Sequence, residues 1–308
     1  MNMTKSRDYR YLGNAPLELV EYSKKREINR IAESQKKLKN ETRKTVFKYY
    51  VSLCLIIRDE NEYLEEWLDW HDKQGVEHFY IYDHGSKNPV LNFLSEHCHE
   101  FLKKATVIDW SGRHKDAQPD AYNDCLKRAR GESRWVGFID TDEQINVKTG
   151  QTLPEFLKDY EDCANLFAMW VVYGANGHIS QTNERLRERF TEVSHGDEWA
   201  EKVGKSIVQP ICMREMVIHN GRTEEGFIIV DEHKNKLDDY VLINETPTRD
   251  LICVDHFYTK SYEEWLNKLR RGSSHAKFSR RYEEFFQINP SMEFCRENIK
   301  IKQEYEKF

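Results

Sequence analysis

The amino-acid sequence predicts an α/β protein with a mainly parallel central sheet and helices on both faces. Four apolar runs of strand length occur in the first half of the chain, at residues 50–57, 76–83, 105–110 and 135–139. Segments with helical periodicity or turn residues separate them, and alternation of strands and helices at this spacing is typical of a parallel sheet. Charged residues follow several of the strands directly, so we also expect a polar crevice beyond their carboxyl ends.

The elements of the first half can be assigned in order. Residues 50–57 (YVSLCLII) are continuously apolar, which indicates a buried strand. Residues 58–75 place apolar side chains at helical spacing and end at Gly75, a helix stop signal. Two further helices are predicted, from Pro89 to about residue 101 and over residues 118–130, each between two of the strands.

The second half of the chain is less regular. Strands are predicted within residues 166–178, 204–213, 215–221 and 251–258. A helix is predicted over residues 260–272, where the final glycine suits a C-terminal stop.

Charge is distributed unevenly along the chain. Residues 1–49 contain 13 Lys and Arg against 6 Asp and Glu, whereas the remainder contains 34 against 47. The basic segment is interpreted as a solvated helical extension or, alternatively, as a surface that contacts an anionic membrane. Nucleic acid is not an expected partner, because the acidic remainder would repel phosphate.

The cysteines and the lack of long apolar segments indicate the compartment. Seven cysteines are scattered singly, without a CxxC pair, which predicts reduced thiols rather than disulfides or a zinc site. No window is apolar enough to span a membrane, and the N-terminus lacks a signal-peptide pattern. We therefore expect a cytoplasmic protein, with residues 1–49 as the segment that could hold it peripherally at the inner membrane face.

Residues 134–145 (RWVGFIDTDEQI) contain the most informative pattern. An apolar strand ends abruptly in three acids, Asp140, Asp142 and Glu143. Neighbouring carboxylates repel one another unless a cation lies between them. Either the strand opens onto a Mg²⁺ or Mn²⁺ site, since these hard cations prefer oxygen ligands, or it meets a solvated acidic turn.

Six segments carry a resemblance to a known family. In chain order they are CLIIRDENEYLEEWLDWHDKQGVEHFYIYDHGS, QPDAYNDCLKRARGESRWVGFIDTDE, WVVYGANGH, ERF, KSIVQP and DHFYTKSYEEWLNKLRRG. Together they cover about residues 50–272, and the ordered set resembles glycosyltransferase family 92 and its bacterial family 2-like relatives. The resemblance implies a GT-A fold and metal-dependent, inverting transfer of a sugar from a nucleotide diphosphate sugar, typically a UDP-sugar. The implied acceptor is a glycan or lipid-linked saccharide in surface polysaccharide synthesis.

Two positions depart from the family pattern. Gln144 follows the acids where an aromatic residue is usual, and YGANGH at residues 173–178 stands where Phe-Gly-Ser-x-Gly-His is commoner. Both flank the implied sugar pocket, so donor and acceptor identity stay open. The resemblance suggests four parts of the chain: a basic helical extension (1–49), a nucleotide-binding half (50–150), an acceptor half (151–272) and a C-terminal helical tail (273–308).

The resemblance also implies roles for individual residues. The implied metal ligands are Asp140, Asp142 and His256, with His219 as the alternative histidine. The implied nucleotide-sugar-binding residues are Arg58, Asp83, Gln118, Asp140 and Lys205. The implied catalytic residues are Glu188, as the general base, and His178, which lies near it. Most of these residues also have a plainer interpretation, as solvated loop residues or hydrogen-bonded core residues.

Two other classes of protein compete with this interpretation. A magnesium-dependent nucleotidyltransferase also groups acids at strand ends, but it would need a glycine-rich phosphate loop after the first strand, and LIIRDENEY has none. An inactive GT-A-like binding module would have no metal to offset the clustered Asp140 and Asp142. We therefore favour the glycosyltransferase.

Overall fold

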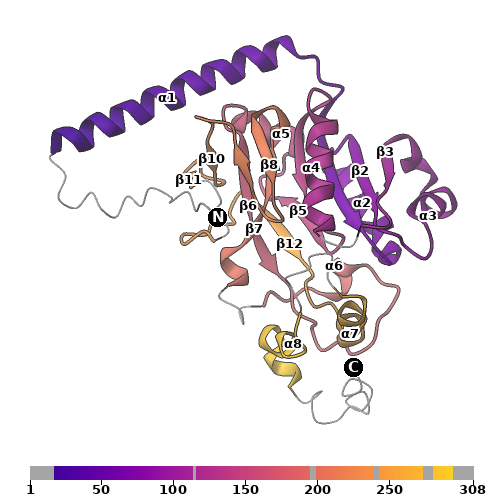
Figure 1. Cartoon of the computed structure of the whole chain (residues 1–308). Coiled ribbons are helices and arrows are strands. Elements are labelled where there is room, and N and C mark those ends of the chain that lie inside the picture. The colour runs from indigo at the N-terminus through magenta and orange to yellow at the C-terminus, as the bar shows by residue number, and fades with distance from the viewer. Residues whose placement is uncertain (1–16, 114–115, 195–198, 239–242, 273–279, 294–308) are drawn as a thin grey trace.

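The computed structural model describes residues 17–113, 116–194, 199–238, 243–272 and 280–293. Within these residues one sheet has the strand order β11-β10-β6-β7-β4-β1-β2-β3, and β12 joins it through β6 and also pairs with β5 (Figure 1). Its strands are β1 (Tyr49–Ile57), β2 (His78–Asp83), β3 (Ala105–Asp109), β4 (Ser133–Phe138), β5 (Glu143–Val147), β6 (Asn165–Val172), β7 (Gly204–Val208), β10 (Ile229–Val230), β11 (Lys236–Leu237) and β12 (Ile252–His256). A separate antiparallel pair consists of β8 (Met213–Met216) and β9 (Gly221–Thr223).

The four strands predicted for the first half form the parallel part of this sheet. β1 pairs in parallel with both β2 and β4, and β2 pairs in parallel with β3. The prediction of one parallel sheet from these strands is therefore confirmed. Successive strands run outward from β1 to β3, whereas β4 lies on the other side of β1, so the order reverses between β1 and β4. Ligands of open α/β sheets bind at such a point.

The other part of the sheet is mixed. β7 lies between β4 and β6 and is antiparallel to both, while β6 is parallel to β10 and β12. β5 was not predicted from the sequence, because its residues EQINV begin with the acids that suggested a turn. It forms because β12 pairs with it in antiparallel register, with His256 opposite Glu143.

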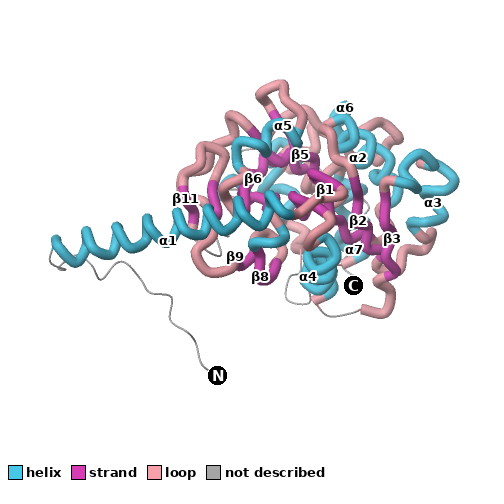
Figure 2. The backbone as a smooth tube through the Cα atoms, turned by 90° about the horizontal axis from the view of Figure 1, so that it is seen from above, coloured by secondary structure: helices cyan, strands magenta, loops and turns pink. Residues whose placement is uncertain are grey.

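Helices cover both faces of the sheet, as predicted (Figure 2). α2 (Asn61–Lys73), α3 (Val90–His97) and α5 (Leu153–Leu157) pack on one face, where Leu64, Trp67 and Leu94 join the main apolar core. α4 (Ala117–Ala129) covers the other face. Short 3-10 helices connect the elements: η2 (His99–Lys103), η3 (Lys158–Tyr160), η4 (Ala200–Lys202), η5 (Pro210–Cys212) and η6 (Pro290–Met292).

The N-terminal arm is largely one helix, α1 (Leu17–Lys44), whose N-terminal half projects from the body (Figure 1). From its middle onward the helix is attached to the body: Leu38 is buried in the core cluster that includes residues of α4, and Arg30, at the middle of α1, pairs with Glu225 at 2.6 Å. Residues 1–16 of the predicted arm lie outside the described residues. None of the described helices combines the length and the apolar character needed to cross a bilayer.

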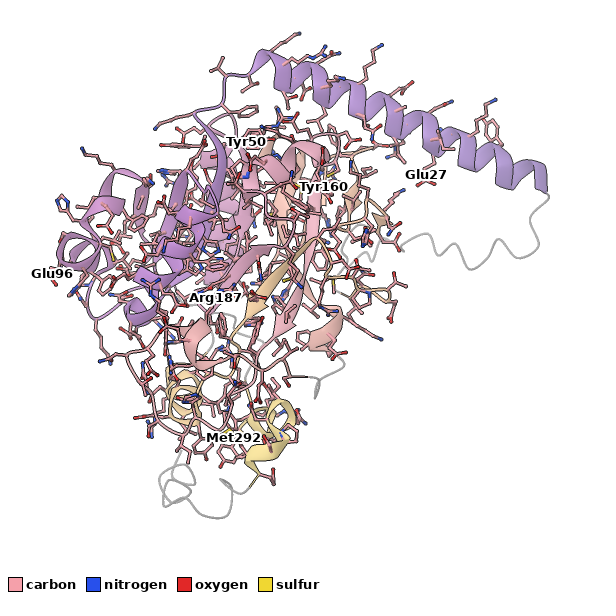
Figure 3. All side chains as sticks on the ribbon, turned by 180° about the vertical axis from the view of Figure 1, so that it is seen from behind. Glu27, Tyr50, Glu96, Tyr160, Arg187 and Met292 are labelled. Carbon is pink, nitrogen blue, oxygen red and sulfur yellow. The ribbon has the colours of Figure 1, made fainter. Side chains whose placement is uncertain are left out.

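Three helices lie below the carboxyl edge of the sheet in Figure 1: α6 (Leu186–Arg189), α7 (Tyr262–Arg271) and α8 (Glu284–Ile288). α7 and α8 share an apolar cluster built on Trp265 and Phe285. Within the predicted tail, 273–279 and 294–308 lie outside the described residues. On α6, Arg187 links three elements (Figure 3), since its guanidinium lies 3.6 Å from the Trp70 ring centroid and 2.5 Å from the Asp255 carboxylate.

Candidate active site

Asp140 follows β4 at the point where the strand order reverses, and its carboxylate is fully engaged. One oxygen accepts hydrogen bonds from Gln118 Nε2 at 2.8 Å and Tyr122 Oη at 3.2 Å, both on α4. The other oxygen pairs with Lys205 Nζ of β7 at 2.8 Å. Burial acts to raise the pKa of Asp140, but the Lys205 ammonium holds that pKa below its ordinary value. The carboxylate is therefore ionised and fixed in orientation.

Asp142 lies two residues further on and is almost completely buried. Its Oδ2 is 2.5 Å from Lys268 Nζ and 3.5 Å from Lys260 Nζ, and its Oδ1 is 3.7 Å from His256 Nε2. Burial opposes ionisation of the carboxyl, but the Lys268 and Lys260 ammonium groups hold the pKa of Asp142 well below its ordinary value. Asp142 is thus a buried anion with two cations on one side and an imidazole on the other.

Sequence analysis missed the two lysines beside Asp142. Lys260 lies in the loop before α7 with φ of 55°, and its ammonium is 4.3 Å from the Tyr63 ring centroid. A positive φ in a residue other than glycine costs roughly 1–3 kcal/mol and occurs preferentially at functional sites. Lys268 lies on α7 with only 5% of its side chain exposed. The sequence did contain one sign that Lys268 is buried: it lies three residues after Trp265, on the apolar side of an amphipathic helix.

The geometry around Asp142 and His256 fits two ligands of one divalent cation. Their 3.7 Å separation is close to that of neighbouring atoms in one coordination sphere. Burial lowers the pKa of His256 to about 3, so the imidazole is neutral, as a ligand must be. Its other nitrogen, Nδ1, faces Glu143 Oε1 at 3.9 Å, and a carboxyl behind the ring is common for metal-binding histidines. Asp140, the third implied ligand, has hydrogen-bond partners on both carboxylate oxygens, and its part in metal binding stays a prediction.

Glu143 is the third acid of the motif and is fully buried beneath the site. It accepts a hydrogen bond from the Asp140 backbone N–H at 2.8 Å and lies 3.3 Å from Lys205 Nζ. Burial raises its pKa to about 8 despite the lysine. Glu143 therefore helps to position Asp140 through its backbone N–H and Lys205 through its ammonium group.

Arg58 and Asp83, at the ends of β1 and β2, are both engaged by the chain itself. Arg58 Nη2 donates to the carbonyl of Arg271 at the end of α7, at 2.7 Å. The Asp83 carboxylate accepts from the backbone N–H groups of Ser86 at 2.8 Å and Val90 at 2.9 Å. Arg58 uses one of its five N–H donors in this contact, so the predicted role of both residues in nucleotide-sugar binding stays a prediction.

The structure does not bring Glu188 and His178 to Asp142. Glu188 is exposed, and its carboxylate accepts from the backbone N–H of Arg185 at 3.4 Å, which caps its own short helix. The His178 ring packs edge-on against Phe190, with centroids 5.6 Å apart. The alternative histidine, His219, donates from Nδ1 to the Gly204 carbonyl at 3.1 Å, and its ring packs against Trp170. Gln144, the departure from the family pattern, is buried and bonded to Glu66 at 3.1 Å.

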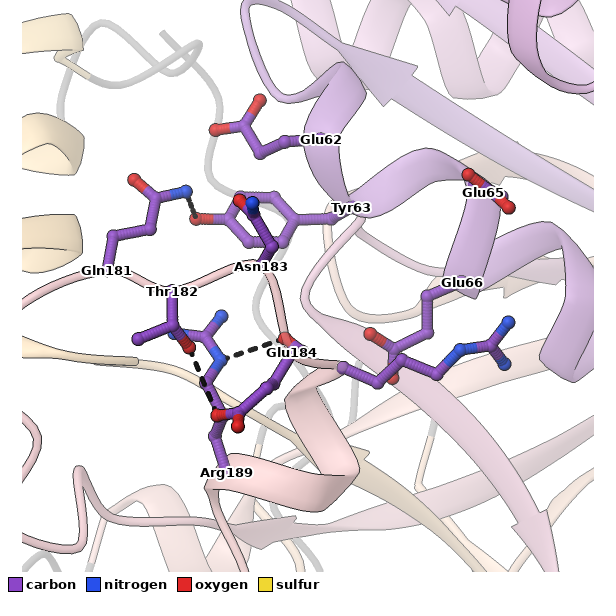
Figure 4. A pocket seen from close by; sticks show the side chains of 10 residues that line it. Glu62, Tyr63, Glu65, Glu66, Gln181, Thr182, Asn183, Glu184 and Arg189 are labelled. Atoms are coloured by element: carbon purple, nitrogen blue, oxygen red, sulfur yellow. Dashed lines mark hydrogen bonds between the residues drawn. The ribbon is translucent and has the colours of Figure 1, made fainter.

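Two other acidic groups are poorer candidates. A pocket beside α2 has a volume of about 310 Å³ and is lined by Tyr63, Arg189 and several glutamates (Figure 4). Within it, Gln181 Nε2 donates to Tyr63 Oη at 3.4 Å. Elsewhere, Glu232, His233 and Asp250 could together offer three metal ligands. The Glu232 carboxylate, however, already accepts three backbone N–H groups at 2.8 Å each. Its role is to fasten the β10–β11 hairpin to the start of β12.

The parallel strands, the reversal of strand order and the acids after β4 define an α/β protein of the GT-A type that the resemblance predicted. The model of the family described as glycosyltransferase family 92 matches residues 48–287. The chain belongs to glycosyltransferase family 92.

Individual relatives agree with this assignment. A glycosyltransferase family 92 protein of Ricinus communis is 32% identical over 193 residues, covering 60% of this chain and 34% of that protein. One from Oryza sativa subsp. japonica is 31% identical over 188 residues, covering 58% of this chain and 30% of that protein. The chain therefore spans about a third of the length of these relatives.

Proposed function

We propose that the protein is a metal-dependent glycosyltransferase that moves a sugar from a nucleotide diphosphate sugar, in particular a UDP-sugar, to a saccharide or lipid-linked saccharide. Family membership supports glycosyl transfer. The single observation that carries metal and diphosphate binding is the arrangement around Asp142, with neutral His256 on one side and Lys260 and Lys268 on the other. We further propose that transfer inverts the anomeric centre and serves surface polysaccharide synthesis.

Each part of the site has a separate task in this proposal. Asp142 and His256 would hold Mn²⁺ or Mg²⁺, which would supply Lewis-acid stabilisation of the leaving diphosphate. Lys260 and Lys268 donate charge-assisted hydrogen bonds to phosphate oxygens on the same side of the crevice. Asp140 is held by Lys205, Gln118 and Tyr122, so it is preorganised to accept hydrogen bonds from the ribose or the sugar.

A thermal-shift panel tests the proposal. The folded protein is incubated with UDP, other nucleoside diphosphates and UDP-sugars, each with and without Mn²⁺. A ligand that binds only the folded state raises the free energy of unfolding, by about 2.7 kcal/mol at a hundred times its Kd. We expect the largest rise in Tm with UDP or a UDP-sugar plus Mn²⁺. The absence of any metal-dependent rise with these nucleotides would contradict the proposal.

Lys268→Gln should weaken nucleotide diphosphate binding without preventing folding. A charge-assisted hydrogen bond contributes about 1.5–3 kcal/mol, so we expect the Kd for UDP with Mn²⁺ to rise by roughly 10- to 100-fold. Isothermal titration calorimetry measures the change. Lys127→Gln, at an exposed position of α4, is the matched control and should leave the Kd unchanged. Equal affinities for both variants would show that Lys268 serves only to neutralise Asp142.

We also propose that the enzyme is cytoplasmic and that α1 holds it at an anionic membrane, where lipid-linked acceptors lie. Lys25→Glu with Arg26→Glu reverses charge on the projecting part of α1, where both side chains are exposed. We expect weaker sedimentation with phosphatidylserine liposomes and an unchanged Tm. Binding by the parent should also fall with salt, because exposed charges are screened beyond about 8 Å at physiological ionic strength. Salt-independent sedimentation would contradict this role.

A further inference from the structure

A second pocket adjoins the candidate active site through His256. It has a volume of about 280 Å³ and lies between the ends of β6 and β12, η4 and α8. His256 belongs both to this pocket and to the pair with Asp142, so a molecule bound here lies next to the proposed metal and diphosphate site. Apart from His256, none of the residues that line the pocket has been given a role so far.

Aromatic side chains form the inner wall of the pocket. Trp199 and Trp170 meet edge to face with ring centroids 6.2 Å apart, and Trp170 lies 4.3 Å from the His256 ring centroid. Tyr258 continues the wall beyond His256, at 5.2 Å. Trp199 is 42% exposed, which is unusual for so large an apolar side chain. Within the described residues, the buried indole N–H of Trp170 has no hydrogen-bond acceptor.

Polar side chains form the opposite rim. Glu284 accepts a hydrogen bond from Tyr258 Oη at 3.0 Å, and its other oxygen lies 3.6 Å from Arg281 Nε. Gln287, one turn further along α8, is exposed and also lines the pocket. The rim therefore offers carboxylate, amide and guanidinium groups opposite an aromatic wall.

This combination matches the chemistry of a pyranose ring. A pyranose has an apolar face of C–H groups that packs on an aromatic ring, and hydroxyl groups around its edge that need donors and acceptors. Aromatic walls with a few placed polar groups are typical of small-molecule sites, and Trp and Tyr combine a large apolar face with a polar atom.

We propose that this pocket is the saccharide subsite of the enzyme, with a pyranose ring packed on Trp199 and Trp170 and its hydroxyl groups bonded to the α8 rim. The inference rests on the proposed function, since it names the substrate class for the same site. The ring can belong to the acceptor or to the sugar of the nucleotide donor, because both present the same chemistry.

The test uses the full chain with UDP and Mn²⁺ present and methyl β-glycosides of glucose, galactose and N-acetylglucosamine as probes. Saturation-transfer NMR detects binding, and titration gives the Kd. For an acceptor subsite we expect at least one glycoside to bind, and Trp199→Ala to weaken it tenfold or more. Leu91→Ala removes an exposed apolar side chain from α3 and is the matched control, with no expected change. Gln287→Ala should weaken the same glycoside less.

The donor arm compares UDP-glucose, UDP-galactose and UDP-N-acetylglucosamine with UDP. If no glycoside binds but one UDP-sugar binds more tightly than UDP, and Trp199→Ala removes that advantage, the pocket holds the donor sugar. If Trp199→Ala changes neither glycoside nor UDP-sugar binding, or if neither kind of probe reports a sugar contact, the saccharide subsite is refuted. Metal-dependent binding of UDP is measured separately. Its loss would overturn the proposed function while leaving a glycoside result intact.

Discussion

Asp142→Asn should reduce glycosyl transfer by on the order of a thousandfold, because the variant loses the anion proposed to bind the metal that stabilises the leaving diphosphate. The asparagine keeps the shape and can still accept a hydrogen bond from Lys268. Alanine is a less informative choice, because it would remove the hydrogen-bond acceptor of Lys268 as well as the charge. Steady-state transfer and Mn²⁺-dependent binding of UDP are the two measurements.

Two comparisons make the Asp142→Asn result specific. Asp120→Asn, at an exposed position of α4, should retain parental transfer. The Tm of Asp142→Asn should show that the variant is folded. If the folded variant transfers sugar at the parental rate, the metal and diphosphate site lies elsewhere in the crevice.

Arg189→Met should produce the largest loss of stability among the single variants considered. Arg189 and Glu264 form a two-bond ion pair at 2.8 and 2.9 Å, and their side chains are only 2% and 1% exposed. Glu264 also accepts from Tyr63 on α2 and caps the start of α7, so the pair joins α2, α6 and α7. Breaking a buried pair costs about 3–5 kcal/mol, which for a chain of this size lowers Tm by roughly 10 °C.

Two controls separate burial from charge in this result. Arg128→Met removes an exposed partner of Asp124 on α4 and should cost less than about 1 kcal/mol. Arg189→Met with Glu264→Met leaves no unpaired charge and should recover part of the loss. Calorimetry measures each Tm. A loss from Arg189→Met no larger than that from Arg128→Met would show that the buried pair does not stabilise the fold.

The same pair gives the stability a defined acid dependence. Burial would raise the pKa of Glu264, but hydrogen bonds from Arg189 and Ser261 lower it from 4.5 to about 2. Because the folded-state pKa is the lower one, the stabilisation is complete above about pH 4.5 and disappears as the pH falls towards 2. The shift corresponds to about 3 kcal/mol. Denaturant titrations from pH 6 to pH 2 should show this loss, and Arg189→Met should show less of it.

Local sequence features were enough to predict the main architecture. Apolar runs gave β1 to β4, and helical spacing with Gly75 and Gly272 as stops gave α2 and α7, because burial periodicity is a property of neighbouring residues. β5 was missed for the same reason. Glu143 and Gln144 look like a solvated turn locally, and only pairing with β12 makes them a buried strand.

The candidate site was only half predictable. Asp140 and Asp142 were identifiable, because two acids after a buried strand are unusual within a short stretch of sequence. The family resemblance named Gln118, Lys205 and His256, but local sequence did not show which acid each of them contacts, and it missed Lys260 and Lys268. Lys205 is 65 residues from Asp140, and Lys268 is 126 residues from Asp142. Glu188 matched a family position in sequence, yet in three dimensions it caps its own helix.

Side-chain polarity along a few residues was enough to predict β1 to β4, the helices α2 and α7, and the acids that follow β4. The tertiary structure alone decided which charges meet. The strand order places β7 beside β4, and this brings Lys205 into contact with Asp140. The packing of α7 below the sheet brings Lys268 into contact with Asp142. A buried charge is tolerated only next to its counter-ion, and that pairing depends on long-range packing that local periodicity does not contain.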